Sequence, residues 1–488
     1  MKIKSIYIPD FLILKDFKIE FYKDKSLAII IGDNGSGKST LLEVIAYIFG
    51  HLHKYFILGD KTAEFIDNYE IEFFSTYQGQ EYEIYLKSVY VNQKTNTFKP
   101  VIKINQKTTS IKEIDDQFGG FKNFLPSRIG VYYAGEAKYL KTLSEHFENK
   151  FIEDIIKEKN PYSLEPLKLP SERPFYYIKD EYLGLILTCL LINASNDNNI
   201  ENFIKELIGD VDINNAEVQI ILKKPEWANK RSGKLWGINS TLIEQFVDKL
   251  NEKASFVENK ESEDEIVYTF YGIIDLIPLF NEFSVERDFS FILLDTLLFN
   301  GILSYVSIDF KLADGTIINS ERLSEGQRQF IVTSGLGILW KNKVNKLFLF
   351  DEPDVFLHPK WQRKYIPFIR EYLDNSFTLL TTHNPALLSD VKREQVFLFR
   401  YGKIIHKAMN TYGQKFETLL IDYFGLESTR NIESTELFEL LYSMIEKKKH
   451  NSTLFQEKYK KLESIVGKDD REFLLLNIEL KKANEKNR

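Results

Sequence analysis

The segment at residues 32–39 restricts the fold of this chain more than any other feature. It reads Gly-Asp-Asn-Gly-Ser-Gly-Lys-Ser and matches the pattern G-x-x-x-x-G-K-[ST] of a phosphate-binding loop. A continuous apolar run at 26–31 precedes it, which is typical of a buried strand in a parallel sheet. Residues 41–49 then favour a helix, which we expect to end at Gly50. The order of strand, glycine-rich turn and helix predicts the start of a nucleotide-binding α/β unit.

The chemistry of such a loop assigns a role to each residue type. Its backbone N–H groups surround phosphates, and the following helix directs its positive end toward them. Lys38 is expected to reach the β- and γ-phosphates of ATP, and Ser39 to coordinate Mg²⁺. The residues expected to bind nucleotide here are Asn34, Gly35, Ser36, Gly37, Lys38, Ser39 and Thr40. An ordinary glycine-rich turn is the alternative, and the flanking strand and helix argue against it.

Two acids end a second apolar strand at residues 346–350. Asp351 is expected to hold Mg²⁺, and Glu352 to orient or deprotonate the attacking water. The alternative is a solvated acid pair that opens a turn, because Pro353 follows. A third strand at 377–382 ends just before His383. The nucleotide-binding sheet is therefore predicted to combine segments from both ends of the chain.

A third motif, at residues 323–329, reads Leu-Ser-Glu-Gly-Gln-Arg-Gln. The Ser324 hydroxyl and the Gly326 backbone at a helix start suit contact with a phosphate, with the Gln327 amide beside them. Ser-Glu-Gly is also a good helix N-cap sequence, which is the structural alternative.

Together these motifs resemble those of the ATP-binding cassette ATPases, in particular the soluble branch that includes SMC proteins, RecF and the OLD family. In this resemblance, residues 323–327 stand at the signature motif and His383 at the switch histidine that contacts the γ-phosphate. Leu-His-Pro at 357–359 is typical of the RecF and OLD branch. The resemblance implies ATP and Mg²⁺ as cofactors, and catalytic roles for Glu352 and His383. It also implies a head-to-tail homodimer, with a higher oligomer left open, in which Ser324, Gly326 and Gln327 of one chain complete the ATP site of the other.

One departure from the family concerns the Q-loop. No glutamine follows the strand predicted at 129–133, where Ala-Gly-Glu occurs at 134–136 instead. The residue that takes the Q-loop role is therefore not identified by the sequence.

The predicted fold is an α/β ATPase head with a mixed, largely parallel sheet, an α+β middle insertion and a helical C-terminal extension. We expect a hairpin around residues 401–402 and a solvated acidic loop at 258–265. The predicted regions are the N-terminal part of the ATPase domain at 1–150, the insertion at 151–285, the C-terminal part of the ATPase domain at 286–410, and the extension at 411–488.

Composition narrows the class of protein. Lys and Arg total 64 against 71 Asp and Glu, a net charge of −7, which argues against a surface coated in positive charge. A single cysteine, Cys189, excludes an intramolecular disulfide framework, a zinc hook and any site with several cysteine ligands, and it favours a reducing cytoplasm. The most apolar stretch, 182–192, is too short to span a bilayer. We therefore expect a cytoplasmic protein with no membrane partner.

The tail from Asn410 to about residue 470 resembles the C-terminal helices of bacterial antiphage-defence ATPases of the PtuA type. Those ATPases pair with a separately encoded nuclease, often of the HNH class. No nuclease is predicted within this chain, since Asp469 and Asp470 read as a solvated helix face and the seven histidines show no metal-ligand grouping. The resemblance implies an ATPase switch or scaffold that binds a separate nuclease subunit.

Two alternatives stay open. The first is a RecF-like repair ATPase whose dimer clamps DNA, and the second is an ATP-held scaffold with little turnover. A basic cluster interleaved with tryptophans could grip phosphate and stack bases. A solvated hairpin whose tryptophans pack on the core is the favoured interpretation of that cluster. It consists of Lys223, Lys224, Trp227, Lys230, Arg231, Lys234 and Trp236.

Overall fold

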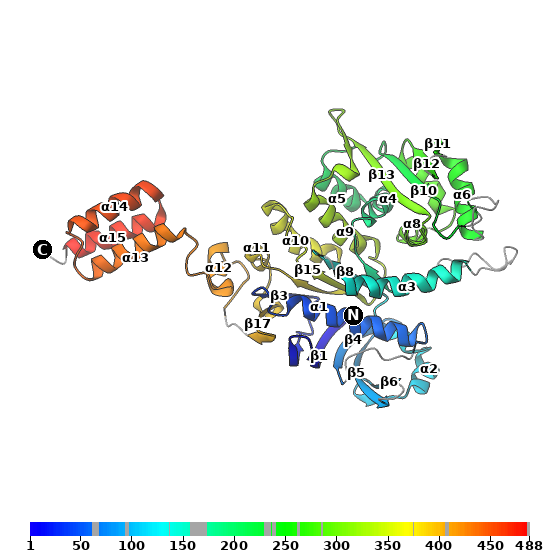
Figure 1. The fold of residues 1–488 in the computed structure, drawn as a ribbon, viewed down its shortest axis with the longest axis horizontal. Coiled ribbons are helices and arrows are strands. Elements are labelled where there is room, and N and C mark those ends of the chain that lie inside the picture. The colour runs from blue at the N-terminus through cyan, green and yellow to red at the C-terminus, as the bar shows by residue number, and fades with distance from the viewer. Residues whose placement is uncertain are drawn as a thin grey trace. The chain divides into compact units, whose positions relative to one another are not determined.

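The computed structural model contains three β-sheets with helices packed around them (Figure 1). It describes residues 1–60, 68–92, 97–135, 137–156, 173–228, 236, 241–260, 264–284, 286–373, 375–405 and 409–485. In these residues the sheets have seven, six and five strands. The mixed α/β class predicted from the sequence is confirmed.

The seven-stranded sheet carries the phosphate loop and is built from both ends of the chain, as predicted. Its strand order is β18-β17-β3-β16-β15-β8-β9, and all neighbours are parallel except β17 and β18, which form the predicted hairpin. The strands are β3 (Leu27–Gly32), β8 (Arg128–Tyr133), β9 (Phe175–Tyr177), β15 (Lys346–Asp351), β16 (Ser376–Thr381), β17 (Val396–Arg400) and β18 (Lys403–Ile405). Strands β3, β15 and β16 are buried along their whole length, which explains their largely apolar sequences.

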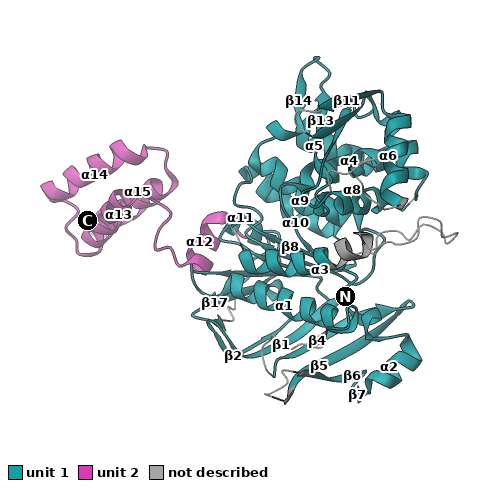
Figure 2. Ribbon diagram, turned by 45° about the vertical axis from the view of Figure 1, so that its right-hand side comes forward, with its two compact units in different colours: residues 1–413 teal, residues 414–488 magenta. Residues whose placement is uncertain are grey.

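The helix after the phosphate loop, α1 (Lys38–Phe56), shares one hydrophobic core with the seven- and six-stranded sheets (Figures 1 and 2). The predicted end of this helix at Gly50 is wrong, because Gly50 is buried inside it. A Cβ atom there would lie 2.8 Å from the side chain of Leu143 on α3 (Lys138–Ile156). Glycine therefore serves the close packing of two helices rather than the termination of one.

The six-stranded sheet is antiparallel, with the order β2-β1-β4-β5-β6-β7. Its strands are β1 (Lys2–Phe11), β2 (Leu14–Glu20), β4 (Glu70–Tyr77), β5 (Gln80–Asn92), β6 (Thr97–Ile104) and β7 (Lys107–Thr108), followed by α2 (Ile111–Phe118) and a 3₁₀ turn, η1 (Phe121–Phe124). Strands β1 and β2 form the first hairpin, and its tip lies beside the phosphate loop, where Ile13 contacts Gly37.

The middle of the chain forms the five-stranded sheet, with the order β11-β12-β10-β13-β14. Its strands are β10 (Glu217–Lys223), β11 (Phe256–Lys260), β12 (Glu265–Phe270), β13 (Leu303–Lys311) and β14 (Ile317–Asn319). The helices of this part are α4 (Tyr182–Ala194), α5 (Asn198–Ile208), α6 (Thr241–Lys253), α7 (Ile273–Asn281) and α8 (Phe289–Phe299).

The loop predicted at 258–265 is correct at Asp264, which lies in a turn, and wrong at residues 258–260 and 265, which lie in strands. Residues 258–260 belong to β11, which pairs with β12 at the edge of the sheet, and residues 261–263 lie outside the described part. The side chains of Glu258 and Asn259 are exposed, so the charge that suggested a loop is compatible with an edge strand.

A buried ion cluster joins the insertion to the ATPase sheets. Arg173, just before β9, donates to both carboxylate oxygens of Asp295 on α8, at 2.9 and 2.7 Å, and to Glu148 on α3 at 2.6 Å. Coulombic attraction from Asp295 and Glu148 raises the pKa of Arg173 well above its usual value, against the opposing effect of burial. Such a fully paired cluster fixes three segments that are distant in the sequence.

Three further helices complete this part of the chain: α9 (Glu325–Leu339), α10 (Pro359–Tyr372) and α11 (Pro385–Leu388). Helix α9 packs closely on α4, since a Cβ atom on Gly335 would lie 2.3 Å from the Ile186 side chain. The 3₁₀ turns η4 (Ser320–Arg322) and η5 (Arg393–Gln395) precede α9 and β17.

The chain divides into two compact units, residues 1–413 and 414–488 (Figure 2). The second unit contains α12 (Phe416–Phe424), α13 (Ile432–Glu446), α14 (Thr453–Val466) and α15 (Arg471–Glu485). Helices α13, α14 and α15 enclose a core of their own that includes Leu441, Phe455 and Leu476. Among the described residues of both units, every helix is too short or too polar to cross a membrane.

Candidate functional site

The phosphate loop joins β3 directly to α1 and has the backbone conformation that phosphate binding requires. Gly35 and Gly37 have φ angles of 74° and 106°, a region that residues with a side chain rarely adopt. The hairpin of β17 and β18 supports the loop, because the Gly402 N–H donates to the Ser36 carbonyl at 2.9 Å. The loop therefore forms a backbone cradle at the positive end of α1, where a phosphate fits.

The Lys38 ammonium is held inside this cradle. It donates to the carbonyls of Gly32 and Asp33, at 3.0 and 3.2 Å, and lies 2.9 Å from Nε2 of His383. Burial lowers the pKa of Lys38, although the nearby carboxylates of Glu352 and Asp351 oppose that shift. A desolvated ammonium ion beside a phosphate cradle is suited to bind the charge of a nucleotide.

Ser39 and Asp351 provide a pair of hard oxygen ligands. The Ser39 hydroxyl lies 3.0 Å from both carboxylate oxygens of Asp351, and the Thr381 hydroxyl donates to Asp351 at 2.6 Å. Asp351 is buried, and this burial raises its pKa, against the hydrogen bonds from Thr381 and Ser39. Hydroxyl and carboxylate oxygens are the ligands that Mg²⁺ prefers, so these two residues fit the metal.

Glu352 is held in an unusual backbone conformation just beyond β15. Its φ angle is 50°, which is uncommon for a residue with a side chain, and its N–H donates to the carbonyl and hydroxyl of Thr381, both at 3.1 Å. Its carboxylate lies 3.1 Å from Nε2 of His383. Such strained positions concentrate at functional sites.

His383 connects Lys38 and Glu352. Its Nε2 atom lies 2.9 Å from Lys38 Nζ and 3.1 Å from Glu352 Oε1. Burial and the charge of Lys38 lower the pKa of His383, so the ring is neutral at pH 7. The Nε2 atom of a neutral ring either accepts from Lys38 or donates to Glu352, because it cannot do both.

The structure places the third motif at the start of α9, where the Gln329 amide donates to the Glu352 carbonyl at 3.4 Å. Ser324 is the N-cap of α9, and its hydroxyl and the Gln327 side chain form a reciprocal capping box. The Gln327 amide also donates to the Leu207 carbonyl at 2.6 Å. Gly326 allows α9 to approach the loop after β15, since a Cβ atom would lie 2.5 Å from the Phe356 carbonyl oxygen. In one chain these contacts explain the motif as a helix start.

Sequence reasoning missed several neighbours of the site. Tyr133 stands opposite Asp351 in the pairing of β8 and β15; burial raises its pKa, and a hydrogen bond with Ser39 opposes this rise. Thr381 joins Asp351 to Glu352 through its hydroxyl. The strand predicted at 129–133 is β8, which could have pointed to Tyr133. No local pattern distinguishes Thr381 from any other strand threonine.

The tips of two hairpins meet the phosphate loop, a position that the sequence did not predict, although the hairpin at 401–402 itself was predicted. Leu12 and Tyr401 both have a φ angle of 50°, and 65% and 89% of their surfaces are exposed. Ile13, next to Leu12, contacts Gly37 and Gly402. Ile13 therefore provides an apolar contact to the loop beside Gly37.

The remaining candidates from the sequence lie elsewhere. Among the basic cluster, Lys223 ends β10 and Trp227 donates its indole N–H to the Asn300 carbonyl at 2.8 Å, whereas residues 230, 231 and 234 lie outside the described part, as does Glu136. His358 caps α10 by accepting from the Lys360 N–H. Asp470 binds Arg430 at 2.7 Å and precedes α15, which gives it a structural role.

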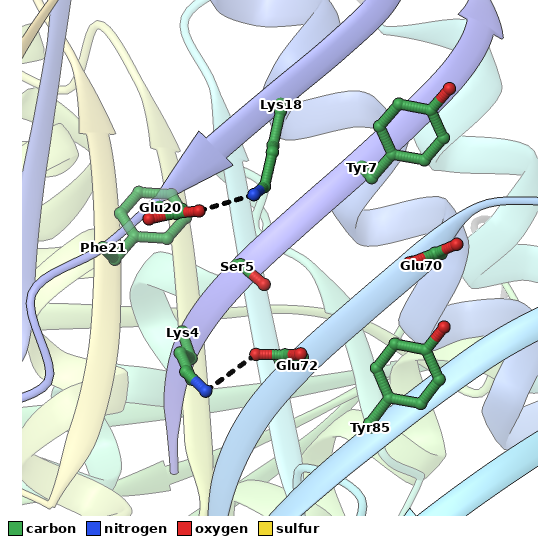
Figure 3. A pocket seen from close by; sticks show the side chains of 9 residues that line it. All are labelled: Lys4, Ser5, Tyr7, Lys18, Glu20, Phe21, Glu70, Glu72 and Tyr85. Atoms are coloured by element: carbon green, nitrogen blue, oxygen red, sulfur yellow. Dashed lines mark ion pairs between the residues drawn. The ribbon is translucent and has the colours of Figure 1, made fainter.

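A separate pocket of about 320 Å³ lies over β1, β2, β4 and β5 of the six-stranded sheet (Figure 3). Its charges are already paired, Lys4 with Glu72 at 2.9 Å and Lys18 with Glu20 at 2.6 Å. This pairing leaves the phosphate loop as the better candidate for an anionic ligand.

A phosphate loop beside an acid pair and a histidine on neighbouring parallel strands defines a P-loop nucleoside triphosphatase. Residues 1–388 match the family model of the AAA ATPase domain, and the chain belongs to this family.

Individual relatives agree with this assignment. The Retron Vc95 probable ATPase of Vibrio cholerae serotype O1 biovar El Tor is 24% identical over 475 residues, which cover 90% of this chain and 82% of that protein. The Septu protein PtuA of Bacillus thuringiensis is 28% identical over 188 residues, 35% of this chain and 44% of that protein. These matches confirm the resemblance predicted from the motifs. Among solved structures, the SMC head domain from Thermotoga maritima is 12% identical with a TM-score of 0.33, covering 84% of this chain and 100% of that one.

Proposed function

We propose that this chain hydrolyses ATP to ADP and phosphate at the site between the phosphate loop and the ends of β15 and β16. The contact of Lys38 with His383, and of His383 with Glu352, carries the proposal. These three groups come from three segments of the chain and meet beside the phosphate cradle. Attack of water on a terminal phosphate requires a cation that binds the phosphate and a base that accepts the proton of the water. Lys38 and Glu352 can fill these two roles, and the imidazole of His383 lies between them.

Each residue has a definite task in this proposal. Lys38 and the loop N–H groups bind the β- and γ-phosphates, and Glu352 accepts a proton from the water whose oxygen attacks the γ-phosphorus. The bond between that phosphorus and the β–γ bridging oxygen breaks, and ADP leaves with the oxygen. Mg²⁺ held by Ser39 and Asp351 supplies positive charge to the phosphate oxygens.

His383 couples phosphate binding to the base. Without nucleotide, the neutral ring accepts from Lys38. A phosphate that draws the Lys38 ammonium toward itself frees Nε2 from this contact. After a change to the tautomer with its proton on Nε2, the ring can donate to the γ-phosphate or to Glu352. We infer that this change of hydrogen-bond partner at His383 couples the binding of nucleotide to the position of the Glu352 carboxylate.

We further propose that the site is completed by a second copy of the chain, with Ser324, Gly326 and Gln327 of that copy facing the γ-phosphate. Three features at one surface support this proposal. Ser324 is a helix N-cap, its side chain is exposed, and the N-terminus of α9 carries the positive end of the helix dipole.

Mixing two inactive variants tests this head-to-tail dimer. Lys38→Ala removes the cation, whereas Ser324→Asp keeps a good N-cap residue but places a carboxylate against phosphate. Each variant alone should be inactive. Random pairing in a mixture should restore roughly a quarter of wild-type turnover, because half of the dimers have one intact site of two. A mixture as inactive as its components would show that Ser324 does not act across a dimer.

In the cell, we propose that the ATPase acts as a switch or scaffold of an antiphage-defence complex with a separately encoded nuclease. The similarity to a retron ATPase and to Septu PtuA supports this role. Direct clamping of DNA and an ATP-held assembly with little turnover are the alternatives, and both are outcomes of the experiments below.

Purification with the neighbouring genes tests the partner. A tagged chain expressed from its native gene cluster should retain a nuclease subunit in fixed stoichiometry, identified by mass spectrometry. If the chain purifies alone and binds DNA tightly with a steep dependence on salt, the repair function is correct instead. Wild-type turnover no higher than that of Lys38→Ala would favour the scaffold.

A further inference from the structure

A buried carboxylate next to the catalytic candidates has no role in the scheme above. Asp354 lies two residues after Glu352, and only 3% of its surface is exposed. Its Oδ2 atom accepts a hydrogen bond from the Thr382 hydroxyl at 3.0 Å. Thr382 itself is fully buried and immediately precedes His383.

The same contact extends to the other side of His383. The Thr382 hydroxyl accepts from the Asn384 N–H at 2.9 Å, and the Asn384 side chain in turn accepts from the Ala386 N–H at 2.9 Å. Both neighbours of His383 are therefore linked to the Asp354 carboxylate, Thr382 directly and Asn384 through the Thr382 hydroxyl. This network fixes the loop between β16 and α11 at the point from which the imidazole projects.

An ionised carboxylate at this buried position lowers the free energy of unfolding. Burial raises the pKa of Asp354 to about 6, and the hydrogen bonds from Thr382 and Asn384 only partly offset that shift. Because the pKa in the folded state lies above the usual value, this group favours folding only at low pH, and its contribution is lost as the pH rises through about 6. At pH 7 the ionised Asp354 therefore disfavours the folded state.

We propose that Asp354 is a positioning residue, which holds the loop of Thr382 and Asn384 so that the His383 ring reaches both Lys38 and Glu352. This inference rests on the proposed ATPase function and assigns to it a residue that contacts neither nucleotide nor metal. A loop held only by its backbone would let the ring leave the narrow distances of 2.9 and 3.1 Å to its two partners.

Asp354→Asn separates positioning from general stability. Asparagine has the same shape, and its amide oxygen can accept from the Thr382 hydroxyl, but it carries no charge, so the hydrogen bond that holds the loop loses its charge assistance. We expect kcat to fall by at least about 10-fold, with the Kd for ATP changed less than 2-fold. The melting temperature at pH 7 should be equal to or higher than that of the wild type. A lower melting temperature with proportional loss of binding would assign Asp354 a purely structural role.

Three matched variants locate the effect at His383. Thr382→Val, which deletes the hydroxyl, should reproduce the loss of kcat, and Thr382→Ser, which keeps it, should restore turnover. Asp354→Asn combined with His383→Ala should be no slower than His383→Ala alone, because residues that act through one group are not additive. Independent losses that multiply in the double variant would overturn the proposal.

Amide hydrogen exchange gives a readout that needs no turnover. The N–H groups of Asn384 and Ala386 are held by this network, so they should exchange at least about 10-fold faster in Asp354→Asn. Unchanged exchange would refute the positioning role. A wild-type protein without ATPase activity would refute the proposed function instead, and the exchange experiment would still decide the role of Asp354.

Discussion

Replacing Lys38 with alanine should weaken ATP binding by about 30- to 4,000-fold, which corresponds to the 2–5 kcal/mol lost when one partner of a buried charge pair is truncated. The ammonium contacts two carbonyls of the loop, which hold it where the phosphates are expected to bind. Isothermal titration calorimetry with a non-hydrolysable ATP analogue measures the change directly.

The control for this variant is its stability without nucleotide. Since burial lowers the pKa of Lys38, the charged form is disfavoured in the folded state, and its removal should leave the melting temperature of the nucleotide-free protein unchanged or higher. At the same concentration, ATP should then stabilise the wild type against heat much more than it stabilises Lys38→Ala. Binding of ATP with wild-type affinity by a folded Lys38→Ala variant would show that the loop does not bind phosphate.

Glu352→Gln should reduce ATP turnover by about 10²- to 10⁴-fold, the usual effect of losing a general base. Nucleotide binding should persist, because Glu352 contacts His383 rather than the loop. If hydrolysis is what opens the proposed dimer, this variant should accumulate as an ATP-bound dimer. Light scattering coupled to size-exclusion chromatography detects this species.

A second carboxylate near the site provides the matched control for this base. Glu43 on α1 is half-buried, and burial and the charge of Asp351 raise its pKa, as expected of a group that could also take up a proton. Glu43→Gln should keep turnover close to that of the wild type. Loss of turnover in Glu43→Gln together with normal turnover in Glu352→Gln would transfer the role of base to Glu43.

The sequence predicted the centre of this structure better than its surroundings. The glycine-rich turn and the strand that ends in two acids have fixed patterns, because backbone geometry and charge restrict which residues work there. Two predictions failed for a different reason: the helix end at Gly50 and the loop where strand Phe256–Lys260 lies. In a sequence, a glycine that allows a second helix to pack closely has the same pattern as a glycine that ends a helix. Likewise, a charged edge strand has the same pattern as a solvated loop.

The contacts that complete the site were beyond local patterns. Lys38 meets His383 across 345 positions of the chain, and Ser39 meets Asp351 across 312. Only the strand order places these residues together, because β16 lies between β3 and β15 in parallel register. The same strand order brings Thr381 to Asp351, and Asp354 to Thr382. These contacts cannot be predicted from composition or from spacing in the sequence.

The position of β3 between β16 and β17 also has a consequence for how the protein is made. During synthesis the phosphate loop leaves the ribosome early, while both strands that pair with β3 are still untranslated. Until β16 and β17 have been synthesised, the apolar β3 has no paired neighbour, and exposed unpaired strands are prone to aggregate. A chain interrupted before β16 would carry an intact phosphate-loop sequence and still lack His383 and a paired β3. The proposed ATP site can therefore form only after the ribosome has added both of these strands, more than 300 residues beyond the phosphate loop.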